Sequence, residues 1–317
     1  MNSLVIPANR YILGPRRPLA DPIWLVGAGR SGTTWASNIL NYRNQYRYLF
    51  EPFHPMFVDA TRAFRAYHYL RPDEPQLVAI AAQVFTGRIQ HPRIDKYTRG
   101  LMFHGLLIKD IFAHLFLKWV DVHFASVRKV LLVRHPFAVA LSKLERAGWS
   151  WLRDPAELLD QQQLRNDYLE PYASLISKTE GDFERQVLIW AITHYVPFQQ
   201  LTNGRLLLVF YEELCVEPEP QVRRMLEFVG DPAAGGPLDD RLQAVIEQAS
   251  QTSSDPRSGN RRRMDRWRAQ LSTAQVASGI RILAEFGLDE IYGDEPMPNS
   301  RAAFQLLESS EPAELDH

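Results

Sequence analysis

The sequence has 317 residues, of which 45% are hydrophobic, and its formal net charge is -1. This length allows one large domain or two small ones, and the near-neutral charge gives no indication of a nucleic-acid partner. The single cysteine, Cys215, excludes an internal disulfide and a cysteine-rich metal site. Residues 1–17 lack the apolar core of a signal peptide, and no stretch approaches the roughly 18 apolar residues of a membrane span. We therefore expect a cytoplasmic protein without a membrane partner.

Short apolar runs alternate with longer helical patterns along the chain. Four runs are continuous in Val, Leu or Ile, as strands buried on both faces are: residues 23–26, 106–108, 130–133 and 206–210. Helices are predicted between and after them, with Pro136 and Pro220 suited to helix starts: residues 34–41, 111–120, 138–147, 182–201 and 220–229. This alternation predicts an α/β fold with a parallel sheet flanked by helices, whose ligands bind beyond the carboxyl ends of the strands.

The remaining segments carry little regular pattern. We expect one domain over residues 1–317, with an N-terminal arm at 1–20 and a frayed acidic tail at 308–317. Residues 149–179 and 250–260 are polar and irregular, which predicts lids or insertions.

The glycine-rich segment after the first strand is the most informative part of the sequence. It reads Gly27-Ala-Gly-Arg-Ser-Gly32-Thr33-Thr34, with glycines at the G-x-x-x-x-G spacing of a phosphate-binding loop. Such a strand, turn and helix start surround a phosphate with backbone N–H groups, so the fold we expect is of the P-loop type. Thr33 stands where a nucleotide triphosphatase has its lysine, and Arg30 lies within the loop instead. The loop therefore suits an anion other than the terminal phosphate of ATP or GTP.

A second anion-binding segment follows the strand at 130–133. Arg134 stands where a nucleotide triphosphatase usually has the aspartate that holds magnesium. If a helix begins near Pro136, Ser142 lies less than two turns along it, where it can share one phosphate with Arg134. The alternative is a surface arginine at the end of a strand.

These segments resemble the sulfotransferases that use 3′-phosphoadenosine 5′-phosphosulfate (PAPS) as donor. The run from Arg30 through Ser31, Gly32, Thr33 and Thr34 to Trp35 is similar to the family's 5′-phosphosulfate loop, and Arg134 with Ser142 matches its 3′-phosphate pair. Tyr211-Glu-Glu-Leu, followed by residues 225–230, resembles a third block, whose tyrosine lies near the adenine. The resemblance covers residues 23 to 230. It implies transfer of a sulfuryl group from PAPS to a hydroxyl of a saccharide or other alcohol, with 3′,5′-adenosine bisphosphate (PAP) as product and no metal.

The resemblance offers two candidates for the catalytic base. Ile111 stands where the cytosolic branch of the family has its histidine. Residues 48–54 resemble instead the Glu-Pro block of carbohydrate sulfotransferases, whose glutamate is the proposed base. This implies that Glu51 is the base, with His54 as the second candidate. Glu51 follows Thr34 by seventeen residues, which is enough for one helix and a return strand to the same edge of the sheet.

Three further expectations concern charged residues. Lys109 contacts the sulfuryl group or the acceptor, or forms an ion pair, and Asp110 pairs with Lys109 or acts as a base. Arg30 stabilises developing charge but cannot transfer a proton, because guanidinium does not titrate in proteins. Residues 257–268 hold six arginines around Trp267, which either contact the 3′-phosphate or form a solvated helix face.

Two other functions remain open from the sequence. A P-loop kinase of nucleotides or small molecules is disfavoured by Thr33 and Arg134, and a non-catalytic nucleotide-binding protein is disfavoured by Arg30 and Glu51. The sequence predicts neither the acceptor nor the oligomeric state.

Overall fold

The computed structural model describes residues 21–309 except 101, 147–150, 203 and 249–263. In this part of the chain five parallel strands form one sheet in the order β2-β3-β1-β4-β5. They are β1 (Ile23–Gly27), β2 (Tyr46–Phe50), β3 (Gly105–Asp110), β4 (Arg128–Val133) and β5 (Leu206–Phe210). The four predicted strands are confirmed, and β2 is the return strand expected before Glu51. All carboxyl ends meet at one edge, so the predicted α/β fold is confirmed.

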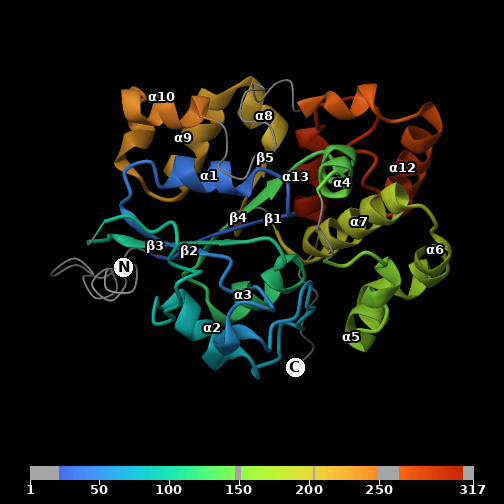
Figure 1. The fold of residues 1–317 in the computed structure, drawn as a ribbon, viewed down its shortest axis with the longest axis horizontal. Coiled ribbons are helices and arrows are strands. Elements are labelled where there is room, and N and C mark those ends of the chain that lie inside the picture. Colours follow the sequence, from blue (N-terminus) through green and yellow to red (C-terminus); the bar gives the residue numbers. More distant parts are fainter. Residues whose placement is uncertain (1–20, 101, 147–150, 203, 249–263, 310–317) are drawn as a thin grey trace.

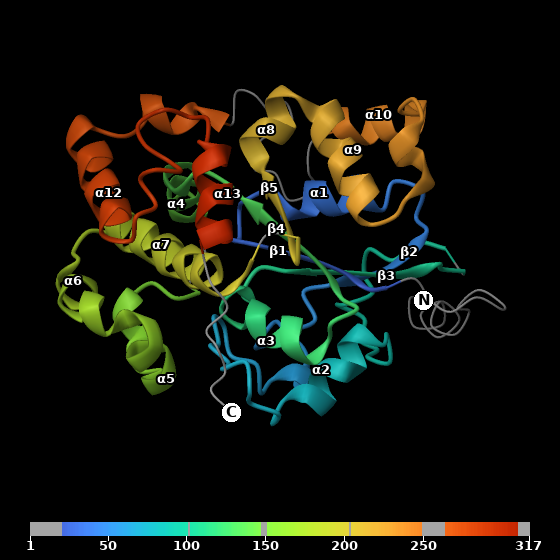
Figure 2. The ribbon, with the colours of Figure 1, turned by 180° about the vertical axis from the view of Figure 1, so that it is seen from behind.

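Helices cover both faces of the sheet (Figure 1; seen from behind in Figure 2). One face carries α1 (Thr33–Leu40), α8 (Tyr211–Val216), α9 (Pro218–Phe228) and α10 (Asp240–Glu247). The other face is covered by α2 (Val78–Phe85), α3 (Leu117–His123), α4 (Pro136–Leu144), α7 (Asp182–Gln200), α12 (Thr273–Glu285) and α13 (Ser300–Ser309). The sheet therefore separates two hydrophobic cores.

Alternation along β1 shows how the strand supplies both cores. Ile23 and Leu25 pack into the cluster that contains α1, while Trp24 and Val26 pack into the cluster that contains α3 and α7. Successive side chains of a strand point to opposite faces, so a continuous apolar run is what a strand covered on both sides needs.

Four of the five predicted helices agree with the structure to within three residues at each end, among them the helix predicted at 34–41, which is α1, and one is displaced. The helix predicted at 182–201 is α7, and Pro136 begins α4, which ends at Leu144 rather than at residue 147. The helix predicted at 220–229 begins two residues earlier, at Pro218. The prediction at 111–120 is wrong over its first half, because the carbonyl of Phe112 accepts a hydrogen bond from the Tyr67 N–H and α3 begins only at Leu117.

The segment 149–179, for which the sequence predicts a lid or an insertion, is helical over most of its described part. Short helical turns follow one another there: Pro155–Leu158, α5 (Gln162–Leu164), Arg165–Leu169, Glu170–Tyr172 and α6 (Ala173–Lys178). Leu158, Leu164, Leu169 and Ile176 anchor them in the core. Each turn buries at most two residues, and Glu170–Tyr172 buries none, which is too few to produce a recognisable helical period.

Several expectations fall outside the described residues. The N-terminal arm at 1–20, the segment 250–260 and most of the tail at 308–317 lie there, although α13 extends to Ser309. Within the described residues no helix is long and apolar enough to cross a bilayer.

Candidate active site

The loop after β1 is built around two glycines that cannot be replaced without a collision. A Cβ on Gly27 would lie 2.6 Å from the carbonyl oxygen of Leu132, and a Cβ on Gly32 would lie 2.6 Å from the ring of Tyr211. Gly32 has φ +97°, and Arg30 also adopts a positive φ of 75°. The Ser31 N–H donates to the carbonyl of Ala28 at 3.0 Å, which closes the turn before α1.

The loop brings together polar groups of a kind that suits an anion. Gly32 caps α1 without a side-chain hydrogen bond, and the first turn of the helix holds no acidic residue. The first N–H groups of a helix have no partner within it, and they attract negative charge. The hydroxyl of Ser31 is buried and has no hydrogen-bond partner among the described residues. Thr33 and Thr34, each 4% exposed, form the first turn of α1 beside it.

Arg134 and Ser142 both lie against this loop. Arg134 follows β4 directly and donates from Nη1 to the carbonyl of Arg30 at 2.8 Å. Its guanidinium lies over the ring of Tyr211, 4.4 Å from the centroid. Arg30 in turn donates from Nε to Ser142 Oγ on α4 at 3.0 Å. The two segments in which the sequence analysis expects anion binding, about a hundred residues apart in the chain, are therefore in direct contact.

Arg146 extends this cluster, and the sequence analysis did not identify it. Burial and the neighbouring guanidiniums of Arg146 and Arg134 lower the pKa of Arg30, while Glu145 acts in the opposite direction. Three like charges repel one another, so an anion is the partner that the cluster favours. Arg146 lies four residues after Ser142 and two residues beyond the end of α4, and its closeness to Ser142 in the sequence was the signal that could have revealed it.

Glu212 positions the strand end that carries Arg134. Its buried carboxylate accepts hydrogen bonds from the His135 N–H and from the Tyr292 hydroxyl, both at 2.9 Å. Burial raises the pKa of Glu212 to about 7. The sequence analysis did not identify this role, because both partners, His135 and Tyr292, come from distant segments of the chain.

Glu51 and Lys109 form a buried ion pair at the ends of β2 and β3. Lys109 Nζ lies 2.6 Å from Glu51 Oε1, and Arg93 Nη2 lies 3.6 Å from Glu51 Oε2. Glu51 adopts a positive φ of 52°, a conformation that costs energy for a residue other than glycine and often occurs at functional sites. One strand, β3, separates β2 from β1, so Glu51 lies about 10 Å from the phosphate loop along the edge of the sheet.

Asp110 does not pair with Lys109, which corrects one of the two readings of that residue. It accepts hydrogen bonds from Trp24 Nε1 at 2.9 Å and from the Phe53 N–H at 3.2 Å. Neighbouring residues of β3 point to opposite faces, so the two side chains diverge. Burial raises the pKa of Asp110 to about 7.

His54 lies beside Glu51 in an aromatic cage. Its ring is 4.0 Å from that of Phe57 and 4.7 Å from that of Trp151, measured between centroids. Burial lowers its pKa to about 4, and Nδ1 accepts a hydrogen bond from the Met56 N–H at 3.3 Å. The ring is therefore neutral at neutral pH.

Trp35, which follows the phosphate loop, and Tyr211, from the third block of the sequence analysis, are in contact. The rings of Trp35 and Tyr211 are 5.8 Å apart and roughly perpendicular. Trp35 Nε1 donates to the carbonyls of Val245 and Ile246 in α10, at 3.3 and 3.2 Å. These contacts join α1, α8 and α10 at the opening of the loop.

A sequence profile described as the sulfotransferase family matches residues 22–234, which is more than half of the chain. The chain belongs to the sulfotransferase family. No curated protein sequence gives a significant match.

Solved sulfotransferase structures resemble the chain at low identity. The sulfotransferase domain of the curacin biosynthetic pathway is 16% identical, with 85% of this chain and 98% of that one covered and a TM-score of 0.47. Mouse sulfotransferase SULT7A1 complexed with PAP is 13% identical, with 97% and 94% covered and a TM-score of 0.46. A sulfotransferase from Alicyclobacillus acidocaldarius is 14% identical, with 84% and 96% covered and a TM-score of 0.40.

The late arginine cluster of this sulfotransferase is described only in part. Residues 257–263 lie outside the described residues, whereas Arg266 pairs with Glu145 at 2.8 Å and Arg268 with Glu295 at 3.0 Å. Trp267 is buried, and its ring stacks on that of His135 at 4.4 Å. The two described arginines of the cluster are thus held in ion pairs, and the tryptophan packs behind the strand end that carries Arg134.

Proposed function

We propose that the chain transfers a sulfuryl group from PAPS to the hydroxyl of an acceptor. The observation that carries the proposal is the contact chain from Arg134 through Arg30 to Ser142, which joins the end of β4 and the loop after β1 to the second half of α4. A donor with a phosphosulfate at one end and a 3′-phosphate at the other requires two adjacent anion sites, and family membership supports the same donor.

The loop residues bind and orient the phosphosulfate end of the donor. The backbone N–H groups of the first turn of α1, the Ser31 hydroxyl and the Arg30 guanidinium stabilise negative charge as it develops. Arg134, Ser142 and Arg146 hold the 3′-phosphate. Trp35 and Tyr211 line the adenine side, where their rings and α10 provide apolar surface.

Glu51 takes the proton of the acceptor hydroxyl in this proposal. Its backbone conformation and its ion pair with Lys109 fix the carboxylate at the edge of the sheet. Lys109 orients that carboxylate and adds positive charge near the transferred group. His54 is the second candidate base, but a ring whose pKa is lowered to about 4 accepts a proton weakly at neutral pH.

The acceptor we propose is a saccharide or another alcohol, supported by the Glu-Pro block at residues 51–52. We also propose that the protein is cytoplasmic, since a single cysteine suits a reducing compartment.

Calorimetry tests the donor class directly. We expect PAP to bind at least about 100-fold more tightly than ATP, because only PAP offers a 3′-phosphate to Arg134 and Ser142. Equal affinities would contradict the proposal. Incubation with ³⁵S-labelled PAPS and a panel of monosaccharides, aliphatic alcohols and phenols then identifies the acceptor class by label transfer.

A further inference from the structure

A second polar pocket lies at the far end of α1 from the phosphate loop. Its cavity has a volume of about 260 Å³. Its lining combines amides, phenols and two arginines: Asn38, Asn41, Tyr42, Asn44, Tyr48, Tyr97, Arg99, Arg241, Ala244, Val245 and Gln248. The loop precedes Thr33, whereas Asn41, Tyr42 and Asn44 follow the helix, which is about 12 Å long. The pocket is therefore distinct from the anion site at Arg30 and Arg134.

Two buried hydroxyls, those of Tyr42 and Tyr48, border this pocket, and each residue is only 3% exposed. The Tyr42 hydroxyl makes no hydrogen bond with any described residue, whereas the Tyr48 hydroxyl lies beside Ser37. Buried polar atoms are nearly always hydrogen-bonded, because leaving one unsatisfied costs about 1–3 kcal/mol. The position of the Tyr42 hydroxyl in the wall of a cavity indicates that its missing partner belongs to a bound molecule or to water.

The charge of the pocket is positive. Arg99 and Arg241 both line it and are exposed, and neither makes an ion pair within the described part of the chain. No carboxylate is among the described lining residues. The nearby Asp231 and Asp239 are engaged by Arg43, at 3.8 and 3.6 Å. The two lining arginines are therefore available to a negatively charged group.

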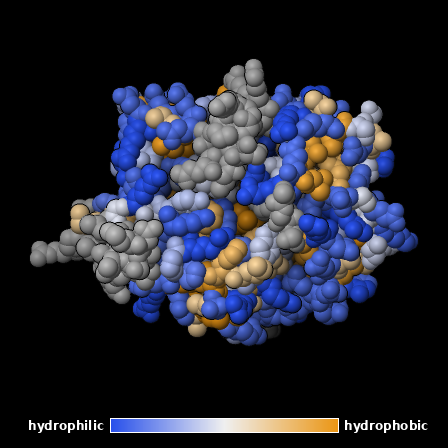
Figure 3. Space-filling model, viewed as in Figure 1, coloured by the Kyte–Doolittle hydropathy of each residue, from blue (hydrophilic) through white to orange (hydrophobic). Residues whose placement is uncertain are grey.

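Neutral donors and acceptors complete the lining. The side-chain amides of Asn38, Asn44 and Gln248 make no hydrogen bond with described residues, and each offers both a carbonyl oxygen and an NH₂ group. Such groups pair with hydroxyls. The surface above α1 and α10, at the upper left of Figure 3, is largely hydrophilic.

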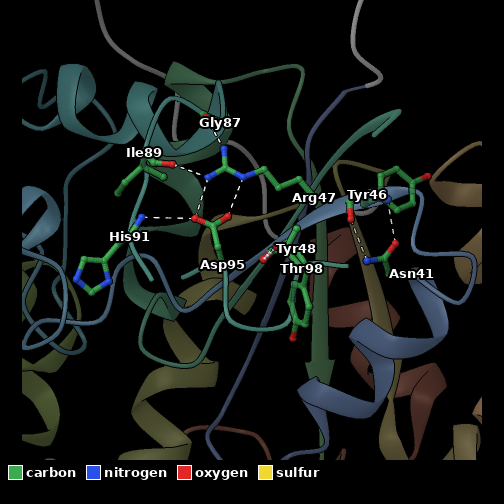
Figure 4. A network of polar contacts seen from close by, with 9 residues as sticks. All are labelled: Asn41, Tyr46, Arg47, Tyr48, Gly87, Ile89, His91, Asp95 and Thr98. Carbon is green, nitrogen blue, oxygen red and sulfur yellow. Dashed lines mark hydrogen bonds and ion pairs between the residues drawn. The ribbon is translucent and has the colours of Figure 1, made fainter. Parts of the chain in front are cut away.

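The wall of the pocket is held in place by hydrogen bonds that do not involve a ligand (Figure 4). The Asn41 amide exchanges hydrogen bonds with both backbone groups of Tyr46, and Thr98 Oγ1 donates to the carbonyl of Tyr48 at 2.8 Å. On the other face of β2, Arg47 pairs with Asp95 at 2.8 Å and fixes the chain that leads to residues 97–99. The pocket is thus formed before any ligand binds, as small-molecule sites usually are.

We propose that this pocket binds an anionic polyol of about the size of one hexose, such as a sugar that carries a phosphate, sulfate or carboxylate group. Arg99 and Arg241 hold the anionic group. The amides of Asn38, Asn44 and Gln248 and the phenols of Tyr42 and Tyr48 take the hydroxyls. The proposal goes beyond sulfuryl transfer and does not depend on it, because none of these residues belongs to the donor site or to the Glu51 pair.

Calorimetric titration with glucose 6-phosphate, glucose 6-sulfate and glucuronate tests the site, with glucose and inorganic phosphate as controls. We expect the charged sugars to bind at least about tenfold more tightly than either control, since only they engage both halves of the lining. The three charged sugars distinguish the anionic groups that the arginines accept.

Variants then locate the binding. Arg99→Gln and Arg241→Gln should each weaken it about tenfold, whereas Arg281→Gln, an exposed arginine on α12, should leave it unchanged. Tyr42→Phe should weaken binding without lowering the melting temperature, because the hydroxyl that it removes has no partner among the described residues. Arg134→Ala should retain binding.

Three results would overturn the proposal. The first is the absence of binding of all three charged sugars at about 10 mM. The second is binding that neither Arg99→Gln nor Arg241→Gln weakens. The third is binding that Arg134→Ala abolishes and the pocket variants leave intact, which would assign the ligand to the donor site. Failure of PAP to bind would contradict the proposed donor and leave these outcomes unchanged.

Discussion

Arg30 Nε lies 3.0 Å from Ser142 Oγ, so the phosphate loop and helix α4 share a hydrogen bond although 112 positions separate the two residues. Arg134 completes the contact by donating to the carbonyl of Arg30 at 2.8 Å. A molecule that places negative charge at the loop therefore also meets the cation at the end of β4. This arrangement explains why the site suits a nucleotide with two separated anionic groups.

Arg134→Ala should weaken binding of PAP far more than binding of adenosine 5′-phosphate. The variant removes a charge-assisted contact to the 3′-phosphate, which only PAP carries, and we expect a loss of about 100-fold for PAP. Calorimetry with both nucleotides measures the difference. Arg281→Ala, an exposed arginine on α12, is the matched control. Equal losses of affinity for the two nucleotides would show that Arg134 does not contact the 3′-phosphate.

Gly32→Ala should damage the phosphate loop more than it damages the fold. A Cβ at this position meets the Tyr211 ring at 2.6 Å, and φ +97° is strained for alanine. We expect a stability loss of about 1–3 kcal/mol and a loss of nucleotide binding at temperatures where the variant remains folded. Thermal melting and calorimetry separate the two effects.

Gly236→Ala is the control for this loop variant. No atom lies within 4 Å of a Cβ built there, and its φ of -110° is ordinary for alanine. Retained nucleotide binding in Gly32→Ala would mean that the close approach of the loop to Tyr211 is not needed for the site.

Local sequence patterns predicted most of the sheet and the phosphate loop. Every residue of the run at 23–26 is apolar because both faces of β1 are covered. At Gly27 and Gly32 the backbone passes too close to its neighbours, Leu132 and Tyr211 respectively, to leave room for a side chain. In these places local chemistry and tertiary structure impose the same requirement, so the sequence pattern is sufficient.

The sequence could not predict features that depend on distant segments. The helix predicted at 111–120 begins later than expected, because the Tyr67 N–H donates a hydrogen bond to the carbonyl of Phe112. In the sequence Glu212 is one of two adjacent glutamates with no distinguishing feature. Its contacts with His135 and Tyr292 exist only in the folded chain. The sequence also does not identify the ion-pair partner of Lys109, because Glu51 follows a different strand, β2.

Glu212→Gln should reduce the loss of stability that accompanies rising pH. Burial raises the pKa of Glu212 to about 7 from an ordinary value of 4.5, so the folded state binds this proton more tightly than the unfolded state. Stability is then highest below pH 4.5 and falls as the pH rises toward 7, by at most about 3 kcal/mol. Glutamine keeps an acceptor for the His135 N–H and does not ionise. We expect the difference in melting temperature between pH 5 and pH 8 to shrink.

The comparison for Glu212 is with Glu213→Gln, its less buried neighbour on α8. Buried groups elsewhere, such as Asp110 and His194, contribute to the pH profile of both variants equally, so the difference between the variants isolates Glu212. An unchanged pH dependence in Glu212→Gln would show that its carboxyl group is already ionised in the folded protein.

Glu51→Gln should abolish turnover and preserve donor binding. Glutamine keeps the shape of the side chain and a carbonyl oxygen for Lys109, but it cannot take a proton from the acceptor, and loss of a general base lowers kcat by about 10²–10⁴-fold. Label transfer from ³⁵S-labelled PAPS measures turnover, and calorimetry with PAP measures donor binding. Glu247→Gln, an exposed glutamate on α10, is the control. Turnover that survives in Glu51→Gln but disappears in His54→Ala would assign the proton to His54, because that ring lies next to Glu51 and is neutral at the assay pH.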